Sequence, residues 1–152
     1  MKKNILIISA CVLGCAVMLT ACGSETKKVS YKDGTYTAQS SVYVNDDGTD
    51  EGNGYGVVTI TIKDGVISDC TYETFEEDGS LKDSDYGKQN GEIANTDYYS
   101  KAQKAVSACE KYAKLLVEQG KLDGIDAFSG ATVNYNEFVE AVNLALAEAE
   151  EK

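Results

Sequence analysis

The stretch Tyr55–Phe75, YGVVTITIKDGVISDCTYETF, decides the fold. In its first half, VTITI at 58–62 alternates apolar residues with threonine, which is the period-two pattern of a strand with one buried face. The dipeptide Asp64-Gly65 then supplies the residue types of a two-residue hairpin turn. The second half, Val66–Phe75, is again rich in β-branched and aromatic residues. The stretch therefore predicts an antiparallel β-hairpin.

A further strand is predicted on the N-terminal side of this hairpin. The segment Thr35–Val44, TYTAQSSVYV, is β-branched and aromatic and follows the turn dipeptide Asp33-Gly34. Between the two predicted strand regions, residues 45–54 read NDDGTDEGNG and contain turn-forming residues throughout. We therefore expect a strand, a loop and then the hairpin.

The first predicted helix covers Asp97–Gln119. Asn95, Thr96 or Asp97 can serve as its N-cap, and Gly120 stands where a helix-ending glycine belongs. Residues at helical spacing form one apolar stripe along it, namely Ala102, Ala105, Val106, Cys109, Tyr112, Ala113 and Leu116. The acidic segment 76–96 before it shows little periodicity, and loops of this length are often functional or mobile.

The second predicted helix runs from about Tyr135 to Glu150. Asn134 and Glu137 resemble a capping box at its start, with asparagine in place of serine or threonine. One face carries the apolar residues Phe138, Val142, Leu146 and Ala149. Because the strands come first and the helices follow, the fold class is α+β: an antiparallel sheet containing the β-hairpin, with two C-terminal helices packed on it.

The N-terminus has the pattern of an export signal. Lys2 and Lys3 precede an apolar run over 5–19, which is short for a membrane span. The following LTAC, ending at Cys22, resembles the bacterial lipoprotein signal, in which the last cysteine is lipidated. An uncleaved anchor helix and an ordinary signal peptide are the alternatives.

The lipoprotein interpretation divides the chain into three parts. We expect residues 1–21 to be the signal peptide, 22–32 a flexible tether, and 33–152 one domain. The protein would then be attached to the extracytoplasmic face of the cell membrane by the lipid on Cys22.

The charge of the chain excludes one class of partner. From Cys22 onward there are 12 lysines and no arginine against 25 acidic residues, a net charge of −13. Such a surface repels phosphate groups, so nucleic-acid binding is excluded and anionic lipid headgroups are poor partners. The charge favours solubility and cationic partners.

Cysteine and histidine usage limits the chemistry further. Cys70 and Cys109 are the two cysteines of the predicted domain, and either a disulfide or two separate buried thiols is compatible with the sequence. Neither has metal-ligand spacing. The chain has no histidine, which removes the commonest acid-base residue and metal ligand.

The segment 126–132, DAFSGAT, lies between the two predicted helices. Gly130 lets the backbone turn, and Ala131 is small enough for a bulky group to approach. Thr132 falls just before a predicted helix N-terminus, where free N–H groups and the helix dipole favour an anion such as phosphate. Its hydroxyl is equally suited to be an ordinary helix cap or the point of a phosphoester.

This segment resembles the flavinylation motif of the FMN-binding domain family, Asp-x-x-(Ser/Thr)-Gly-Ala-(Thr/Ser). The resemblance covers most of the exported chain, from the first strand through the hairpin to the last helix. The family includes lipoproteins of extracellular electron transfer and flavin subunits of membrane redox pumps. After its hairpin the family often shows a histidine and a Glu-Thr-Pro-Gly turn, whereas this chain reads Glu73-Thr74-Phe75 with neither histidine nor proline.

The resemblance implies a cofactor, a site and partners. FMN would be joined covalently through its phosphate to Thr132, with Asp126, Ser129, Gly130 and Ala131 forming the recognition loop. A separate flavin transferase, using FAD and a divalent metal, would make the bond. The protein would then act as an electron carrier between a membrane quinol-linked redox partner and an extracellular electron acceptor, rather than as a free-standing enzyme.

Three aromatic residues are candidates for contact with the flavin ring. Phe128 lies inside the loop and suits either the ring or the core. Tyr55 and Tyr86 stand beside glycines in loop-like surroundings and can stack on a flavin. Two other functions remain open: a lipoprotein that binds a phosphorylated ligand non-covalently, and an extracellular FMN-dependent reductase.

Overall fold

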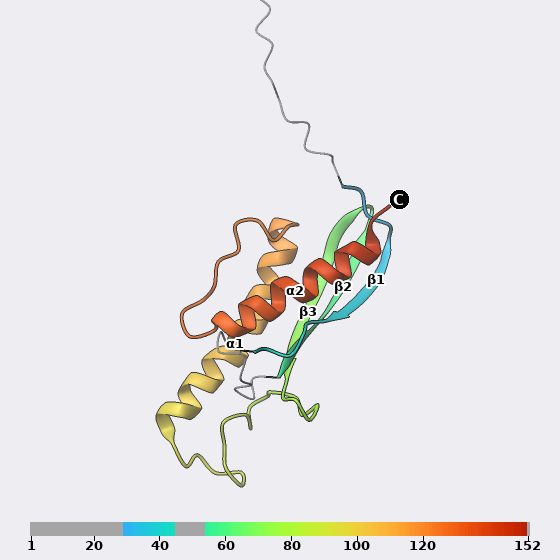
Figure 1. Cartoon of the computed structure of the whole chain (residues 1–152). Helices are drawn as coiled ribbons and strands as arrows, with labels where there is room; N and C mark the ends of the chain where they lie inside the picture. The colour runs from blue at the N-terminus through green and yellow to red at the C-terminus, as the bar shows by residue number, and fades with distance from the viewer. Residues whose placement is uncertain (1–28, 45–53, 152) are drawn as a thin grey trace, which may run out of the picture.

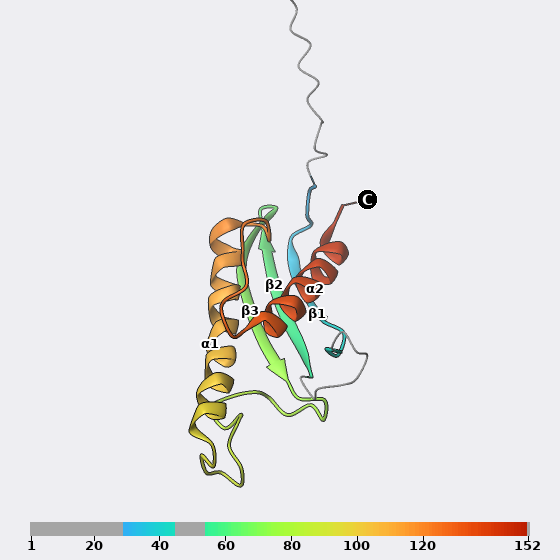
Figure 2. The same cartoon turned by 60° about the vertical axis from the view of Figure 1, so that its left-hand side comes forward.

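Figure 1 shows the computed structural model of the chain, which describes residues 29–44 and 54–151. Its elements are β1 (Gly34–Gln39), β2 (Tyr55–Lys63), β3 (Val66–Phe75), α1 (Thr96–Gln119) and α2 (Thr132–Ala149). The three strands form one antiparallel sheet in the order β1-β2-β3. Both helices lie on one face of this sheet, α1 against β3 and α2 across β2 and β1 (Figures 1 and 2). The predicted α+β class and the helix packing are confirmed.

Several sequence-based predictions fall outside the described residues. These are the signal peptide at 1–21, the lipidation site Cys22, the tether up to residue 28 and nearly all of the loop at 45–54. The end of the predicted tether is described, and it belongs to the folded part. Lys32 N–H donates to the Ala149 carbonyl oxygen at 2.9 Å, and Glu151 N–H donates to that of Ser30 at 3.0 Å.

The hairpin turn has the backbone conformation that its sequence predicts. Asp64 and Gly65 both have positive φ angles, 54° and 73°, as a type I′ turn requires. The alternation in β2 buries Val58, Ile60 and Ile62 against the helices. Threonines occupy the opposite face, where the Thr37 and Thr59 hydroxyls of neighbouring strands lie 2.9 Å apart.

The first strand is shorter than predicted. Regular pairing of β1 ends at Gln39 rather than at Val44. Ser40 is the cause, because its side chain is buried and its hydroxyl oxygen accepts the Gly56 N–H at 2.9 Å. A side chain thus occupies a position that a backbone carbonyl would hold in a continued ladder.

The start of α2 also corrects a prediction. The helix begins at Thr132 rather than near Tyr135, so Asn134 and Glu137 are interior helix residues and not a capping box. Asn134 instead donates from its amide nitrogen to the Cys109 sulfur at 3.4 Å, and Glu137 is 3% exposed. In α1, by contrast, the Asn95 side chain caps the helix by accepting the Tyr98 N–H at 2.9 Å.

The core lies between the sheet and the two helices. Three aromatic rings meet at its centre: Phe138 lies 5.0 Å from Tyr72 and 5.5 Å from Tyr112, measured between ring centroids. Phe138 and Tyr112 are completely buried. Aromatic pairs at such distances contribute about 1 kcal/mol each beyond the apolar area they bury. This cluster fixes α1 and α2 relative to each other directly beneath the loop that joins them.

Candidate functional site

The loop that joins the helices is held by two tyrosine hydroxyls. The buried Tyr112 hydroxyl of α1 accepts the Phe128 N–H at 2.8 Å and donates to the Ala131 carbonyl oxygen at 3.3 Å. The Tyr135 hydroxyl of α2 donates to the Ile125 carbonyl oxygen at 2.7 Å. The loop 125–131 is therefore attached to both helices at its two ends.

The turn at the end of this loop sets the start of α2. Ala131 N–H donates to the Phe128 carbonyl oxygen at 3.0 Å, and Gly130 has a φ of 81°. No other atom lies within 4 Å of the position a Cβ would take at Gly130, so glycine is favoured here by backbone conformation and not by lack of space. Thr132 follows as the first helical residue.

The N-terminus of α2 is open to an anion. Its N-cap residue, Ala131, makes no side-chain capping hydrogen bond, and its first turn carries no acidic residue. The first N–H groups of a helix have no intrahelical acceptor, and the helix dipole places partial positive charge there. The exposed Thr132 side chain therefore stands beside donors suited to a phosphate.

Thr132 lies on the wall of a cavity of about 500 Å³, here called the Thr132 cavity. Four parts of the chain form this wall: the end of β3, the loop after it, one face of α1, and the start of α2. The lining residues are Thr74, Glu76, Lys82, Tyr86, Tyr98, Ala102, Ala105, Val106 and 130–134. Small-molecule and cofactor sites have volumes of roughly 300–1,000 Å³, so the size suits a cofactor.

The long loop predicted at 76–96 is observed at 76–95, forms one side of the cavity and is attached to the helical layer. Lys82 N–H donates to the Thr74 carbonyl oxygen at 2.9 Å, which holds the loop beside β3. The Gln103 amide of α1 donates to the carbonyl oxygens of Asp83 and Tyr86 at 3.0 and 2.9 Å. These bonds place the Tyr86 ring, with the Lys82 ammonium 5.2 Å from its centroid, in the cavity wall.

A buried carboxylate lies one helical turn beyond the cavity residue Asn134. Neither side-chain oxygen of Glu137 has a hydrogen-bond partner among the described residues. Burial raises the pKa of Glu137 from 4.5 to about 7, and the charge of Lys82 partly offsets this rise. The neighbouring Tyr72 hydroxyl also lowers the pKa of Glu137, but its one proton is donated to the Asn134 carbonyl oxygen at 2.7 Å. Glu137 thus interacts electrostatically with Lys82, which lines the cavity.

Lys82 is the basic member of this pair and is 7% exposed. Burial lowers the pKa of its ammonium group, while the negative charges of Glu137 and Glu76 act in the opposite direction. The attraction between Lys82 and Glu137 thus favours the charged form of each side chain.

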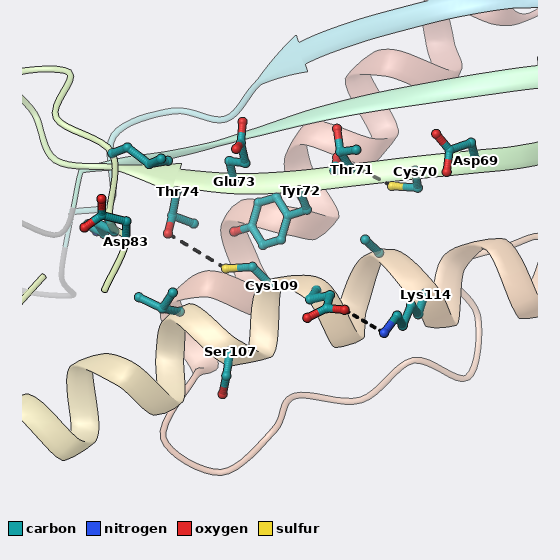
Figure 3. A pocket seen from close by; sticks show the side chains of 15 residues that line it. Asp69, Cys70, Thr71, Tyr72, Glu73, Thr74, Asp83, Ser107, Cys109 and Lys114 are labelled. Atoms are coloured by element: carbon teal, nitrogen blue, oxygen red, sulfur yellow. Dashed lines mark hydrogen bonds and ion pairs between the residues drawn. The ribbon is translucent and has the colours of Figure 1, made fainter. Parts of the chain in front are cut away.

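A second cavity, of about 550 Å³, adjoins the first between β3 and α1 (Figure 3). The two share Thr74, Lys82 and Val106 as lining residues. Both Cys70 and Cys109 line the second cavity as free buried thiols, on β3 and α1 respectively, so the structure supports separate thiols and not the disulfide. Burial raises the pKa of Cys70 to about 12, which keeps this thiol protonated.

The structure brings together some of the residues predicted from the motif. Gly130, Ala131 and Thr132 line the Thr132 cavity together with Tyr86, which comes from a distant part of the sequence. Asp126 and Ser129 are exposed on the preceding loop and are not among the described residues that line the cavity.

The two other predicted ring contacts lie elsewhere. Phe128 turns toward the core, with its ring centroid 4.8 Å from that of Tyr112. Tyr55 stacks on Phe75 at 5.4 Å across the β2–β3 pair. Within the described part of the chain, neither residue lines the Thr132 cavity.

Among the residues that sequence reasoning missed are Lys82 and Tyr98 in the cavity wall and Glu137 beside it. Lys82 and Tyr98 belong to segments without a motif, and only the folded loop and the start of α1 bring them to the cavity. The spacing of Asn134 and Glu137 predicted a capping box. Because α2 begins at Thr132, Glu137 is instead a buried residue inside the helix. Asn134 and Glu137 lie three positions apart on the helix face that carries Phe138 and Val142. Two polar residues on an otherwise buried face could have indicated a polar pocket.

Replacing Tyr112 with phenylalanine should destabilise the protein by about 2 kcal/mol. The change removes the acceptor of the Phe128 N–H and leaves that donor without a partner, at a cost of about 1–3 kcal/mol. Urea denaturation measures the loss. The control is Tyr36→Phe, whose hydroxyl donates to the Lys32 carbonyl oxygen at an exposed site and should cost about 0.5 kcal/mol. Equal losses in the two variants would contradict the anchoring role of Tyr112.

Two features are absent from residues 29–44 and 54–151. No helix there is long and apolar enough to cross a membrane. No group of three or more histidine, cysteine, aspartate or glutamate residues is arranged there to hold a metal ion.

Comparison with solved structures finds two clostridial proteins. A crystal structure of the CPE2226 protein from Clostridium perfringens has 23% sequence identity and a TM-score of 0.57, and covers 78% of this chain and 88% of its own. A solution NMR structure of a protein from Clostridium thermocellum has 26% identity and a TM-score of 0.42, and covers 79% and 93%. The first likeness supports the fold. No curated protein sequence matches the chain.

Comparison with protein families gives a match that includes the site. The sequence profile of the FMN-binding domain matches residues 51–147, which is more than half of the chain and contains β2, β3, α1, the loop 125–131 and most of α2. The chain therefore belongs to the FMN-binding domain family.

Proposed function

We propose that this protein carries FMN in a phosphoester bond to the Thr132 hydroxyl and acts as an electron carrier on the extracytoplasmic face of the cell membrane. The lipid on Cys22 would hold it there. Membership of a flavin-binding family supports the cofactor. The single observation that supports the attachment point is the position of Thr132, exposed at the uncapped first turn of α2 and on the wall of the cavity.

The residues around Thr132 fit a phosphate group followed by a flat, partly polar ring. The open first turn of α2 offers N–H donors to the phosphate. Beyond it, the wall provides the rings of Tyr86 and Tyr98 for stacking and the polar side chains of Lys82 and Asn134 for hydrogen bonding. Bound FMN supplies transfer of one or two electrons, which none of the side chains can perform.

The attachment step requires a separate flavin transferase with FAD as donor and a divalent metal. The Thr132 hydroxyl oxygen forms the new bond to the FMN phosphorus, and the pyrophosphate bond of FAD breaks. AMP leaves, and the hydroxyl proton passes to a base of the transferase. Thr132 suits this role because its side chain is exposed and accessible to a second protein.

Once loaded, the carrier would take electrons from a membrane quinol-linked partner and pass them to an extracellular acceptor. The net charge of −13 beyond the signal, from 12 lysines and 25 acidic residues, favours a partner with a cationic docking surface. The walls of the cavity would hold the ring, while the protein itself needs no further substrate site.

The test is expression of the full chain with and without a flavin transferase. With the transferase, the detergent-extracted protein should show flavin fluorescence on a denaturing gel and an intact mass increased by one FMN residue. Flavin that is lost on denaturation or dialysis would instead support non-covalent binding of a phosphorylated ligand. Absence of any mass gain with an active transferase would refute covalent attachment.

A further inference from the structure

Glu137 carries a buried carboxylate whose oxygens have no hydrogen-bond partner in the described part of the chain. Only 3% of the residue is exposed. Leaving a buried polar group unpaired costs about 1–3 kcal/mol, and more for a charged one. Such groups are rare in folded proteins and usually have a functional reason.

Glu137 is held firmly in this position by its surroundings. It lies in the second turn of α2, directly before the fully buried Phe138. A Cβ built on Gly56 of β2 would meet the Glu137 Cβ at 3.1 Å and the Tyr72 hydroxyl at 2.8 Å, so the strand passes close to the carboxylate's stem. The side chain therefore has no route to the bulk solvent on the sheet side.

Glu137 lies beside residues that line the Thr132 cavity: Asn134 precedes it by one turn of α2, and Gly56, which its Cβ approaches, pairs with Thr74. Its nearest cationic neighbour is Lys82, which lines that cavity and also the adjoining one. Tyr86, another lining residue, also interacts electrostatically with Glu137. The charge of the Glu137 carboxylate therefore acts on Lys82 and Tyr86, two residues in the wall of the Thr132 cavity.

We propose that Glu137, positioned behind Lys82, takes up a proton when the flavin held in the Thr132 cavity is reduced. The inference rests on the proposed function, since it requires FMN in that cavity. For each pair of electrons from the quinol-class donor, two protons are released. One proton goes to the flavin, and Glu137 takes the other from solvent at a carboxylate oxygen. Reoxidation by the acceptor returns this proton to solvent.

Two physical reasons support uptake at Glu137 and not at another group. Added negative charge in the cavity raises the proton affinity of a carboxylate behind its wall, and the low local dielectric strengthens this effect. The group also titrates in the physiological range, because burial raises the pKa of Glu137 to about 7. The other groups that face it from the packed elements are Lys82, Tyr72, Cys109, Tyr86 and Glu140.

Lys82 acts on Glu137 as a positive charge, and none of the other four neighbours is a comparable acceptor. Burial raises the pKa values of the Tyr72 and Cys109 side chains, so both stay protonated near neutral pH. Tyr86 is also protonated, since burial and the nearby Tyr98 raise its pKa to about 12. Glu140 lies one turn further along α2, half-buried, and accepts the Ser41 hydroxyl at 2.6 Å. Of the two carboxylates, Glu137 is thus the buried one whose oxygens have no hydrogen-bond partner in the described part of the chain.

Potentiometric titration of the loaded full chain tests the proposal. One additional proton taken up per electron pair changes the midpoint potential by about 30 mV per pH unit. As the pH rises above about 7, the midpoint potential of the wild-type protein should fall by about 30 mV per pH unit more than that of Glu137→Gln. Glu140→Gln, which removes the same charge one turn away, should keep the wild-type slope. Parallel lines for wild type and Glu137→Gln would overturn the proposal.

A second measurement does not depend on flavin or electron transfer. In the unloaded protein labelled with ¹³C at glutamate carboxyl groups, the NMR signal of Glu137 should titrate near pH 7. The isosteric variant Lys82→Met should move this midpoint upward, because the neighbouring positive charge is lost. An unchanged midpoint would show that Lys82 does not act on Glu137 and would overturn its positioning role.

The outcomes also separate this proposal from the proposed function. Intact mass establishes first whether Thr132 carries FMN. If the wild-type chain does not load, covalent attachment fails and the potentials are not measured, while the NMR titration still decides the Lys82–Glu137 interaction. If it loads and the slopes are equal, the carrier function stands and proton uptake at Glu137 is wrong.

Discussion

Replacing Thr132 with alanine should abolish covalent flavin completely when the full chain is expressed with a flavin transferase. The substitution removes the only atom through which the phosphoester can form at this position. The fold should tolerate it, because Thr132 is exposed at the first residue of α2 and alanine is a good helix former. In-gel flavin fluorescence and intact mass measure the loss, and circular dichroism confirms that the variant is folded.

A matched control is available at the start of the other helix. Thr96 is the first residue of α1 and is exposed, so Thr96→Ala makes the same chemical change at an equivalent helix position. This variant should load as fully as the wild type. Thr132→Ser keeps the hydroxyl and should also load. Undiminished fluorescence in Thr132→Ala would place the flavin elsewhere, and loss of loading in Thr96→Ala would point to a general effect on folding.

The sequence predicted the fold wherever local pattern and tertiary burial agree. The hairpin is the clearest case, since the alternation in β2 and the Asp64-Gly65 turn predict its two strands and its turn. The register shift at Thr61 and Ile62, where one extra residue of β3 lies opposite, has no local pattern that predicts it. The α1 boundaries were also predicted within a residue, because Asn95 caps the helix locally and Gly120 ends it with a φ of 68°. In these elements, short-range chemistry is sufficient to determine the structure.

Predictions failed where a contact between residues distant in the sequence overrides the structure that the local pattern favours. Ser40 ends β1 early by accepting a hydrogen bond from Gly56 on the next strand. Asn134 and Glu137 have the spacing of a capping box, yet the Gly130 turn and the Tyr112 anchor start α2 earlier and bury both side chains. No local pattern carries this information, because it depends on how two helices pack on the sheet.

The site shows the same division. The segment 126–132 could be identified from sequence, and three of its residues do line the Thr132 cavity. On the opposite wall, Tyr86 was predicted and does line the cavity. Lys82 was not predicted, because it reaches the cavity through a loop whose path is set by bonds to Gln103 and Thr74. Phe128 was predicted as a ring contact because it lies inside the loop, and Tyr55 because it stands beside a glycine. Each instead packs on another aromatic side chain.

Replacing Glu137 with glutamine should make the flavin-free protein more stable at pH 8 but not at pH 4. Burial raises the pKa of Glu137 from 4.5 to about 7, so the native state holds a proton that the unfolded chain releases over this interval. Stability contributed by this protonated carboxyl is fully present below pH 4.5 and is lost as the pH rises through 7. One pKa unit corresponds to about 1.4 kcal/mol, so the loss is on the order of 3 kcal/mol.

Glutamine has the same shape but does not titrate, so this loss is absent in the variant. Urea denaturation of both proteins at pH 4, 6 and 8 should therefore show a difference in unfolding free energy that grows with pH and levels off above 7. Glu148→Gln, an exposed change on the same helix, should follow the wild-type profile at every pH. A Glu137→Gln protein whose stability runs parallel to the wild type would mean that the carboxylate ionises as freely in the folded protein as in the unfolded chain. The pKa of Glu137 would then be the same in the folded and the unfolded protein. Glu137 would stay ionised near neutral pH, and the proposal of proton uptake would lose its physical basis.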